Sequence, residues 1–200
     1  MERDTRQQIL DTAKKEFAQH GLEGARVDII AAHAKINKAM IYYHFQSKEN
    51  LYQAVIDSHV EEIGNFLEAS LVEISIPEDI FPKLAEFYNN VISSKDTFLP
   101  IMLREVAGGG ERVKHALTNV FFKRGLSGKL KKLIDDGIKT RRFRDVDSRN
   151  AVISFLGMNL FYLIFASAMN AVWEIKDEKK FRQKRAKEVV DLFLYGLKAR

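Results

Sequence analysis

The sequence lacks cysteine altogether, and its 200 residues include only 3 prolines and 11 glycines. The lack of cysteine excludes disulfides, thiolate metal ligands, CxxC redox chemistry and a cysteine nucleophile. A chain of this length buries enough apolar surface to fold without such cross-links. With few prolines and glycines, the chain has few turn signals to separate many short strands, and no long segment alternates apolar and polar residues. These absences favour an all-α fold.

An apolar secretory signal is also missing, because the charged residues 1–4 lead directly into an amphipathic segment. We therefore expect a cytoplasmic protein. Residues 151–173 form a stretch of 23 residues without charge, long enough to span a membrane. Because small and polar residues are scattered around this stretch, we favour a helix buried between a domain core and a second subunit over a membrane span.

The excess of positive charge is unevenly distributed along the chain. The net charge of +5 divides into +1 over residues 1–56, −8 over 57–111 and +12 over 112–200. A basic chain favours nucleic acid or an anionic membrane as partner. Since the excess lies in the C-terminal part, where each basic run also fits a solvated helix face, bulk charge does not locate a DNA-binding surface.

Apolar residues recur at helical spacing along the chain and predict about nine helices. Gly21 suits a left-handed turn at the end of the first helix, near His20. The second and third helices are short and flank a turn, whereas the fourth is long. The expected N-caps are Thr5 for the first helix, Asn37 for the third (38–45), Ser47 for the fourth (48–72), Asp96 or Thr97 for the sixth, and Asp147–Ser148 for the eighth.

Prolines and glycines indicate further boundaries. Pro77 and Pro82 bracket the start of the fifth helix, and Pro100 lies in the first turn of the sixth. Three glycines at 108–110 precede a seventh helix of roughly 25 residues, judged by its periodicity. We expect the fifth helix to extend through Val91 and Ile92, and the ninth to run from about residue 177 to residue 198.

Residues 26–51 hold the pattern most informative about function. Two helices joined by a three-residue turn are too short to be stable alone and must pack on the first helix. Their apolar residues leave Lys38, Tyr42 and Tyr43 on an outer face with the shape and donors to enter a DNA major groove. Lys48, at the start of the next helix, can hold a phosphate beside free backbone N–H groups. From these residues alone, a helix-turn-helix and an ordinary three-helix core both stay open.

The same run resembles the N-terminal domain of the TetR (tetracycline-repressor-like) family of bacterial transcriptional regulators. The chain has the residues of the family pattern at Val27, Ile30, Ala31, Ala34, Ile36, Ile41, Tyr42, His44, Phe45, Lys48 and Leu51. Upstream, the family's first helix and turn are matched at Ile9, Leu10, Ala13, Phe17 and Gly21. The match covers about a quarter of the chain continuously, and identities and spacing agree together.

The resemblance implies a helix-turn-helix DNA-binding domain over residues 1–47 and a larger helical effector-binding and dimerisation domain over 48–200. It implies a homodimer through the eighth and ninth helices, bound to a palindromic double-stranded operator. It further implies a repressor that leaves this operator when an unidentified small molecule binds the C-terminal domain. We expect no enzyme activity, no cofactor, no metal site and no membrane partner.

Three residues depart from the family pattern. Lys35 stands where the family usually has glycine, so a non-glycine residue is expected in a strained turn. Arg26 replaces the usual Thr or Ser cap of the second helix, and Asp28 replaces a basic or polar residue that can reach DNA. The full set of expected DNA-binding residues is Arg26, Asp28, Asn37, Lys38, Ala39, Met40, Tyr42, Tyr43, His44 and Lys48.

Aromatic residues in the C-terminal three quarters are candidates for an effector cavity with a few polar anchors. Each of them, taken alone, equally fits an ordinary core position. The candidates are Phe66, Phe87, Phe98, Met102, Arg104, Phe121, Phe122, Met158, Asn159, Phe161, Tyr162 and Phe165.

Two rival functions remain. A constitutive DNA-binding protein would have no cavity, and a helical enzyme or membrane-surface protein would use the basic C-terminal runs. The five histidines form no metal-binding spacing, and the glycines at 108–110 lack the GK[ST] ending of a phosphate-binding loop. If changes in the third helix abolish sequence-specific DNA binding, the chain is a DNA-binding protein and not an enzyme or a membrane-surface protein.

Overall fold

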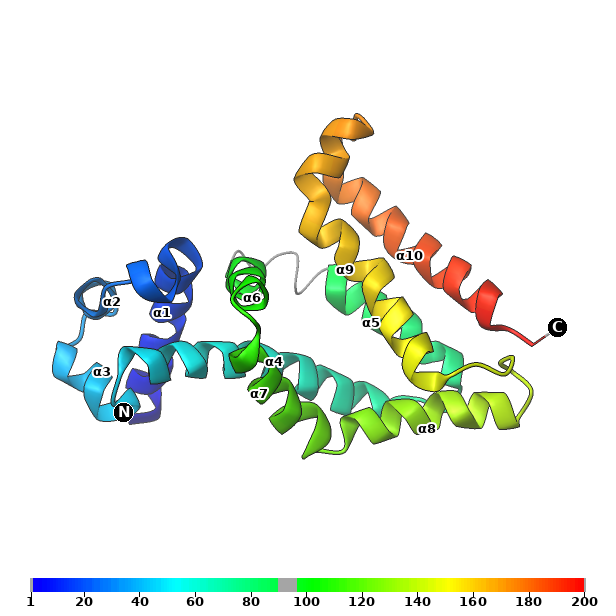
Figure 1. The fold of residues 1–200 in the computed structure, drawn as a ribbon, viewed down its shortest axis with the longest axis horizontal. Coiled ribbons are helices and arrows are strands. Elements are labelled where there is room, and N and C mark those ends of the chain that lie inside the picture. Colours follow the sequence, from blue (N-terminus) through cyan, green and yellow to red (C-terminus); the bar gives the residue numbers. More distant parts are fainter. Residues whose placement is uncertain (1, 90–96, 200) are drawn as a thin grey trace. The chain divides into compact units, whose positions relative to one another are not determined.

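The computed structural model describes residues 2–89 and 97–199, and over these residues the chain is helical, without strands beyond one isolated bridge between Phe143 and Lys198 (Figure 1). The expected all-α fold is therefore confirmed. In chain order the α-helices are α1 (Glu2–Gly24), α2 (Val27–His33), α3 (Lys38–Phe45), α4 (Lys48–Glu73), α5 (Ile80–Phe87), α6 (Phe98–Ala107), α7 (Glu111–Leu117), α8 (Leu126–Lys139), α9 (Ser148–Val172) and α10 (Glu178–Leu197).

The contacts divide the chain into two units, each of which packs around its own core. Unit 1 comprises the described residues of 1–64 and 95–120, and unit 2 those of 65–94 and 121–200. Unit 1 therefore contains α6 and α7 in addition to α1, α2, α3 and the first part of α4. The functional boundary expected between residues 47 and 48 stays a prediction.

The core of unit 1 follows from the apolar stripes of its helices. Ile9 and Phe17 of α1, Ile30 of α2 and Ile41 of α3 are fully buried. The Phe17 ring meets the edge of Tyr52 in α4, with ring centroids 4.8 Å apart. Since α2 and α3 have 7 and 8 residues, this packing against α1 supplies the stability that short helices lack.

The first helix differs from the expectation at both ends. It begins at Glu2, so Thr5 lies inside the helix and the cap expected from it is wrong. Gly21 has φ 67° and ψ −176°, a conformation essentially restricted to glycine, and breaks the helical path as expected. Helical geometry resumes after this break, so α1 continues to Gly24.

The expected seventh helix is in fact two helices. After α7 the chain forms a π-helical turn over Thr118–Phe122, and Gly125 then adopts φ 69° before α8 starts. The prediction failed because the apolar periodicity continues across this break, and a single glycine gave little reason to interrupt it. The described residues thus form ten α-helices where about nine were expected.

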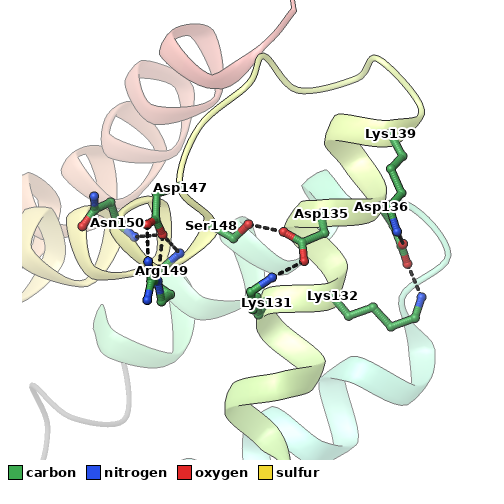
Figure 2. Close-up of polar contacts among 9 residues, drawn as sticks. All are labelled: Lys131, Lys132, Asp135, Asp136, Lys139, Asp147, Ser148, Arg149 and Asn150. Atoms are coloured by element: carbon green, nitrogen blue, oxygen red, sulfur yellow. Dashed lines mark hydrogen bonds and ion pairs between the residues drawn. The ribbon is translucent and has the colours of Figure 1, made fainter.

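Other boundaries follow local signals to different degrees. Asp147 accepts hydrogen bonds from the backbone of Arg149 and Asn150, at 2.8 and 3.4 Å, and so caps α9 as expected (Figure 2). Thr97 makes no side-chain bond to α6, so that cap is wrong. The predictions for Val91, Ile92 and Asp96 lie outside the described residues.

Unit 2 packs α5, α8, α9 and α10 around a cluster of aromatic rings. Phe81 of α5 lies 5.0 Å from Phe155 of α9 and 4.8 Å from Phe193 of α10, measured between ring centroids. Gly137 is required in α8, because a Cβ there would lie 2.3 Å from the ring of buried Phe143. In Figure 2 the Ser148 hydroxyl, at the start of α9, donates to Asp135 of α8 and joins the two helices.

Helix α9 buries only one side of its uncharged stretch. Phe155 and Tyr162 point into unit 2, whereas Ile153, Phe161 and Val172 are more than half exposed. By length and composition α9 is apolar enough to cross a membrane, with 11% of its most apolar window buried. A large apolar face of α9 therefore lacks a cover within the described part of the chain.

Candidate nucleic-acid interface

The turn between α2 and α3 is tightly held. Lys35 adopts φ 52°, which confirms that a non-glycine residue occupies the strained position of the turn. The backbone N–H of Ile36 reaches back to the carbonyl of Ala31 at 3.1 Å. From α1, the Gln8 amide donates to the carbonyl of Ala34 at 2.8 Å. The angle between the two short helices is therefore fixed by backbone contacts and by α1.

Both short helices are held at the N-terminus. Asn37 accepts a hydrogen bond from the backbone of Ala39 at 2.8 Å, so the cap expected for α3 is confirmed. Arg26 precedes α2 in an extended conformation and its side chain makes no capping bond. Instead, its backbone N–H donates to the buried carboxylate of Glu16 in α1 at 3.3 Å. Glu16 thus holds the residue that precedes α2, although it does not bond the N–H groups in the first turn of α2 that a capping side chain would accept.

Helix α3 presents most of its polar and aromatic surface to solvent. Ile41 and Phe45 are buried, and the Phe45 ring also faces the guanidinium of Arg6 at 4.9 Å. Tyr43 is 65% exposed and Tyr42 is 44% exposed. Of the other expected DNA-binding residues, Arg26, Asp28, Asn37, Lys38 and Ala39 are exposed, and Met40, His44 and Lys48 are half-buried.

An ion pair links the first turns of α2 and α3. The Lys38 ammonium lies 2.8 Å from the Asp28 carboxylate. The hydrogen bond from Lys38 lowers the pKa of Asp28 below its ordinary value of 3.8, and the same bond raises the pKa of Lys38. The acid that departs from the family pattern is thus charged and bound to the first residue of α3.

The start of α4 lies beside the chain that enters α2. The Ser47 hydroxyl accepts from the backbone of Asn50 at 3.0 Å, which confirms it as the cap of α4. The Lys48 ammonium donates to the carbonyls of Glu23 and Ala25, each at 3.4 Å. The Lys48 side chain therefore connects the start of α4 to the chain that enters α2, and this segment has both a cation and a helix N-terminus, the two features of a phosphate site.

Three α1 side chains that hold this surface in shape could not be identified from the sequence. Arg6 contacts Phe45, Gln8 contacts Ala34, and Glu16 contacts Arg26. Each is a polar residue on a helix, a type that usually faces solvent, and each acts on a partner at least 10 residues away along the chain. No motif spacing reveals such contacts.

The expected effector-binding residues are divided between the two units. In unit 1, the Phe98 ring meets the edge of His59 at 5.4 Å and Met102 is half-buried. Arg104 donates to backbone carbonyls of α1. These contacts are internal to unit 1.

The other nine candidates belong to unit 2. Phe66 stacks on Phe87 at 4.1 Å, and Phe161 and Phe165 contact each other at 4.9 Å on the exposed side of α9. Tyr162 is buried and donates to Asn170 at 2.7 Å. Phe122 is 75% exposed, Phe121 and Met158 are half-buried, and Asn159 donates to the carbonyl of Phe155 at 2.9 Å.

Several hollows lie in unit 2. A small one of about 20 Å³ includes Tyr88, Asn159, Tyr162 and Arg185 in its lining. A groove of about 630 Å³ runs between α5 and α10, with Ala85 and Val190 among its lining residues. Burial raises the pKa of Tyr88 to about 12, so its hydroxyl stays protonated beside the small hollow. Two of the expected effector-binding residues, Asn159 and Tyr162, therefore line a hollow together.

Comparison with known proteins connects this surface to one family. The model of the tetR family of bacterial regulatory proteins matches residues 9–55. The transcriptional repressor NicS of Pseudomonas putida is 31% identical over 142 residues, which cover 70% of this chain and 66% of NicS. A second repressor, SCO4008 of Streptomyces coelicolor, is 36% identical over 75 residues, so the match spans 38% of this chain and 34% of that protein.

Solved structures agree over nearly the whole chain. FadR of Bacillus subtilis, in complex with stearoyl-CoA, has a TM-score of 0.74 at 16% identity, covering 95% of this chain and 98% of FadR. AibR, in complex with isovaleryl coenzyme A and operator DNA, has a TM-score of 0.71 at 22% identity and covers 94% and 97%. At these identities the likeness shows a shared fold.

Proposed function

Because the chain belongs to the tetR family of bacterial regulatory proteins, we propose that it is a transcriptional regulator that reads operator DNA with α3. The observation that carries this proposal is the surface of α3, an eight-residue helix held by Asn37 and the α1 contacts, with Tyr42 and Tyr43 exposed. A helix held in this way fits a major groove.

We assign the roles within this surface by side-chain chemistry. Lys48 and Tyr42 bind phosphates, because a cation beside a helix N-terminus and an exposed tyrosine hydroxyl both suit contacts to the DNA backbone. Lys38, Met40 and Tyr43 contact base edges, which differ between sequences in the major groove. Of the remaining expected residues, Arg26, Asp28, Asn37 and Ala39 lie at or beside the starts of α2 and α3, and His44 lies in the last turn of α3.

The regulator is proposed to be a repressor that releases DNA when a small molecule binds its C-terminal domain. NicS is a transcriptional repressor, FadR was solved with stearoyl-CoA, and AibR with isovaleryl coenzyme A and operator DNA. A molecule that preferred the DNA-incompetent state about 10⁴-fold would shift the population from 1:99 to 99:1. We propose that it acts in the cytoplasm as a binding protein and has no enzyme activity.

We further propose a homodimer through α9 and α10. Ile153, Phe161 and Phe165 give α9 an exposed apolar side, and Leu192 and Tyr195 of α10 are also exposed. A second copy covers both helices symmetrically and places two α3 helices on the two halves of a palindrome. By length α9 would also fit a lipid bilayer, but a second copy covers the exposed apolar residues of both helices.

One experiment tests this function. The purified chain selects duplexes from a random DNA pool, and the enriched duplex is titrated against the protein. We expect a palindromic sequence, two chains per duplex, and affinity well above that for unselected DNA. Recovery of no preferred sequence would overturn the proposal. A compound that raises the Tm of the chain yet leaves the duplex bound would overturn the release step.

A further inference from the structure

We infer that Arg104 of α6 is a positioning residue of the DNA-binding surface, acting through α1. Its Nη1 donates to the carbonyls of Phe17 and Ala18, the first at 3.1 Å, and its Nη2 donates to the carbonyl of Gln19 at 3.1 Å. One guanidinium thus binds three successive carbonyls of α1, from a residue 85 to 87 positions away along the chain. All four residues belong to unit 1.

These carbonyls need an external donor because α1 breaks just after them. Gly21 leaves the helical conformation, and carbonyls in the last turn before such a break lose their regular intrahelical partners. A cation at this end also complements the negative end of the helix dipole. The Arg104 side chain packs directly on the break, with its Cδ 3.5 Å from where a Gly21 Cβ would stand. Arg104 therefore caps the first segment of α1.

The capped turn is next to the residue that holds α2. Glu16 immediately precedes the three carbonyls, and its buried carboxylate accepts the backbone N–H of Arg26 at the start of α2. Movement of this turn would carry Glu16 with it and shift the start of α2. Since Asp28 of α2 pairs with Lys38 of α3, the disturbance extends to the proposed reading helix.

Arg104 stands on a segment that is itself attached to α4. The Arg112 guanidinium lies 5.7 Å from the centre of the Tyr52 ring and 3.9 Å from the Glu105 carboxylate. The Gln53 amide donates to the carbonyl of Arg112 at 3.3 Å. These contacts fix α6 and α7 within unit 1, so Arg104 is presented to α1 from a held position. As an effector anchor, Arg104 would have only the two N–H groups that do not bind α1 to offer.

This inference rests on the proposed DNA-binding function, but its first test does not use DNA. In Arg104→Ala, amide hydrogen exchange at residues 22–26 should accelerate by about tenfold or more, because hydrogen bonds from a charged donor are lost. Exchange in α10 should stay unchanged. Arg104→Lys keeps one cation and should recover part of the protection. Lys114→Ala, which removes an exposed cation of α7, is the matched control and should behave as the wild type.

The second test measures binding to the duplex selected by the wild-type chain. Arg104→Ala should weaken this binding by about tenfold. The dependence of affinity on salt should keep its slope, because Arg104 neutralises no phosphate. A purely structural role would instead lower Tm and speed exchange evenly through both units, with no selective effect on residues 22–26.

Several results would overturn the inference. The first is an exchange rate at residues 22–26 that equals the wild-type rate in both Arg104 variants. The second is wild-type affinity of Arg104→Ala for the duplex. The third is a salt slope that Arg104→Ala reduces by about one unit, which would indicate direct phosphate contact. A wild-type chain that selects no duplex would overturn the proposed function and with it the positioning role. Because the exchange experiment does not use DNA, it would still show whether Arg104 caps α1.

Discussion

The Asp28 carboxylate and the Lys38 ammonium lie 2.8 Å apart and connect the first turns of α2 and α3. The sequence marked both as residues facing DNA, one an acid that phosphates repel and the other a cation that they attract. Their pairing means that these two side chains together carry no net charge in the free protein. The acid therefore limits what Lys38 contributes to binding of DNA in general.

Replacing this acid should raise affinity for unselected DNA. In Asp28→Asn, Lys38 loses its ion-pair partner and the surface gains one net positive charge, so binding to a random duplex should become tighter and the salt slope steeper by about one unit. Preference for the selected duplex should fall accordingly. Asp191→Asn changes an exposed acid of α10 and serves as the control. An unaltered salt slope in Asp28→Asn would contradict this account of the pair.

Phosphate and base contacts should separate in a mutant series. Lys48→Ala and Tyr42→Phe should weaken binding to all duplexes alike, and Lys48→Ala should also lower the salt slope by about one unit. Changes at Met40 or Tyr43 should instead alter the preferred sequence, by about 1–3 kcal/mol for each affected base pair. Titrations against the selected duplex and its single-base variants measure both effects. Equal losses on every duplex at all four positions would refute the assignment.

The apolar side of α9 should be an interface between two copies. Ala168 is exposed, so Ala168→Glu should place a charge in that interface and produce monomers that bind the palindrome poorly. Ala69→Glu makes the same change at an exposed position of α4 and should stay dimeric. Sedimentation at micromolar concentration distinguishes the two states. A monomeric wild-type chain would disprove the dimer.

Two turn positions should respond in opposite directions. Lys35 has φ 52°, so Lys35→Gly should leave the free energy of unfolding unchanged or raise it by up to about 1 kcal/mol. Gly21 has φ 67° and ψ −176°, so Gly21→Ala should destabilise it by about 1–3 kcal/mol. Urea unfolding of both variants tests this. Destabilisation by Lys35→Gly beyond 1 kcal/mol would show that its side chain has another role.

Acid should weaken the fold below about pH 4. Asp147 has its pKa lowered by its bonds to Arg149, and Glu68 by its bond to Arg124. A carboxyl with a lowered folded pKa stabilises the fold above its ordinary value of 3.8 or 4.5, and this contribution disappears as pH falls through the folded pKa. Urea unfolding should therefore show a nearly constant free energy of unfolding from pH 7 to 5 and a decrease below pH 5. This decrease should be smaller in Asp147→Asn. An equal decline in that variant would exclude Asp147 as a source.

Local chemistry in the sequence was sufficient for the surface of α3 and for several helix starts. Asn37, Ser47 and Asp147 cap their helices because a cap needs only residues within a turn of it. The contacts of Glu16 and Arg104 were not predictable, since they join residues distant in sequence and follow no period. The break at Gly125 was missed because the apolar stripe resumes in α8 with a similar pattern.

The effector site is the part least accessible from sequence. Aromatic residues at helical spacing fit a core and a cavity equally, and the structure separates them into buried rings such as Phe87, exposed ones such as Phe122, and residues that line a hollow, such as Tyr162. These differences depend on tertiary packing. The assignment of all twelve candidates to an effector site stays a prediction.

The central claim, that α3 reads an operator, is tested most directly by repeating the selection of duplexes from random DNA with the Tyr43→Ala variant beside the wild type. The account predicts that the wild type enriches one palindrome, and that the variant enriches a sequence altered at the same position in both halves. Enrichment of the same palindrome by both proteins, with equal affinity, would contradict it.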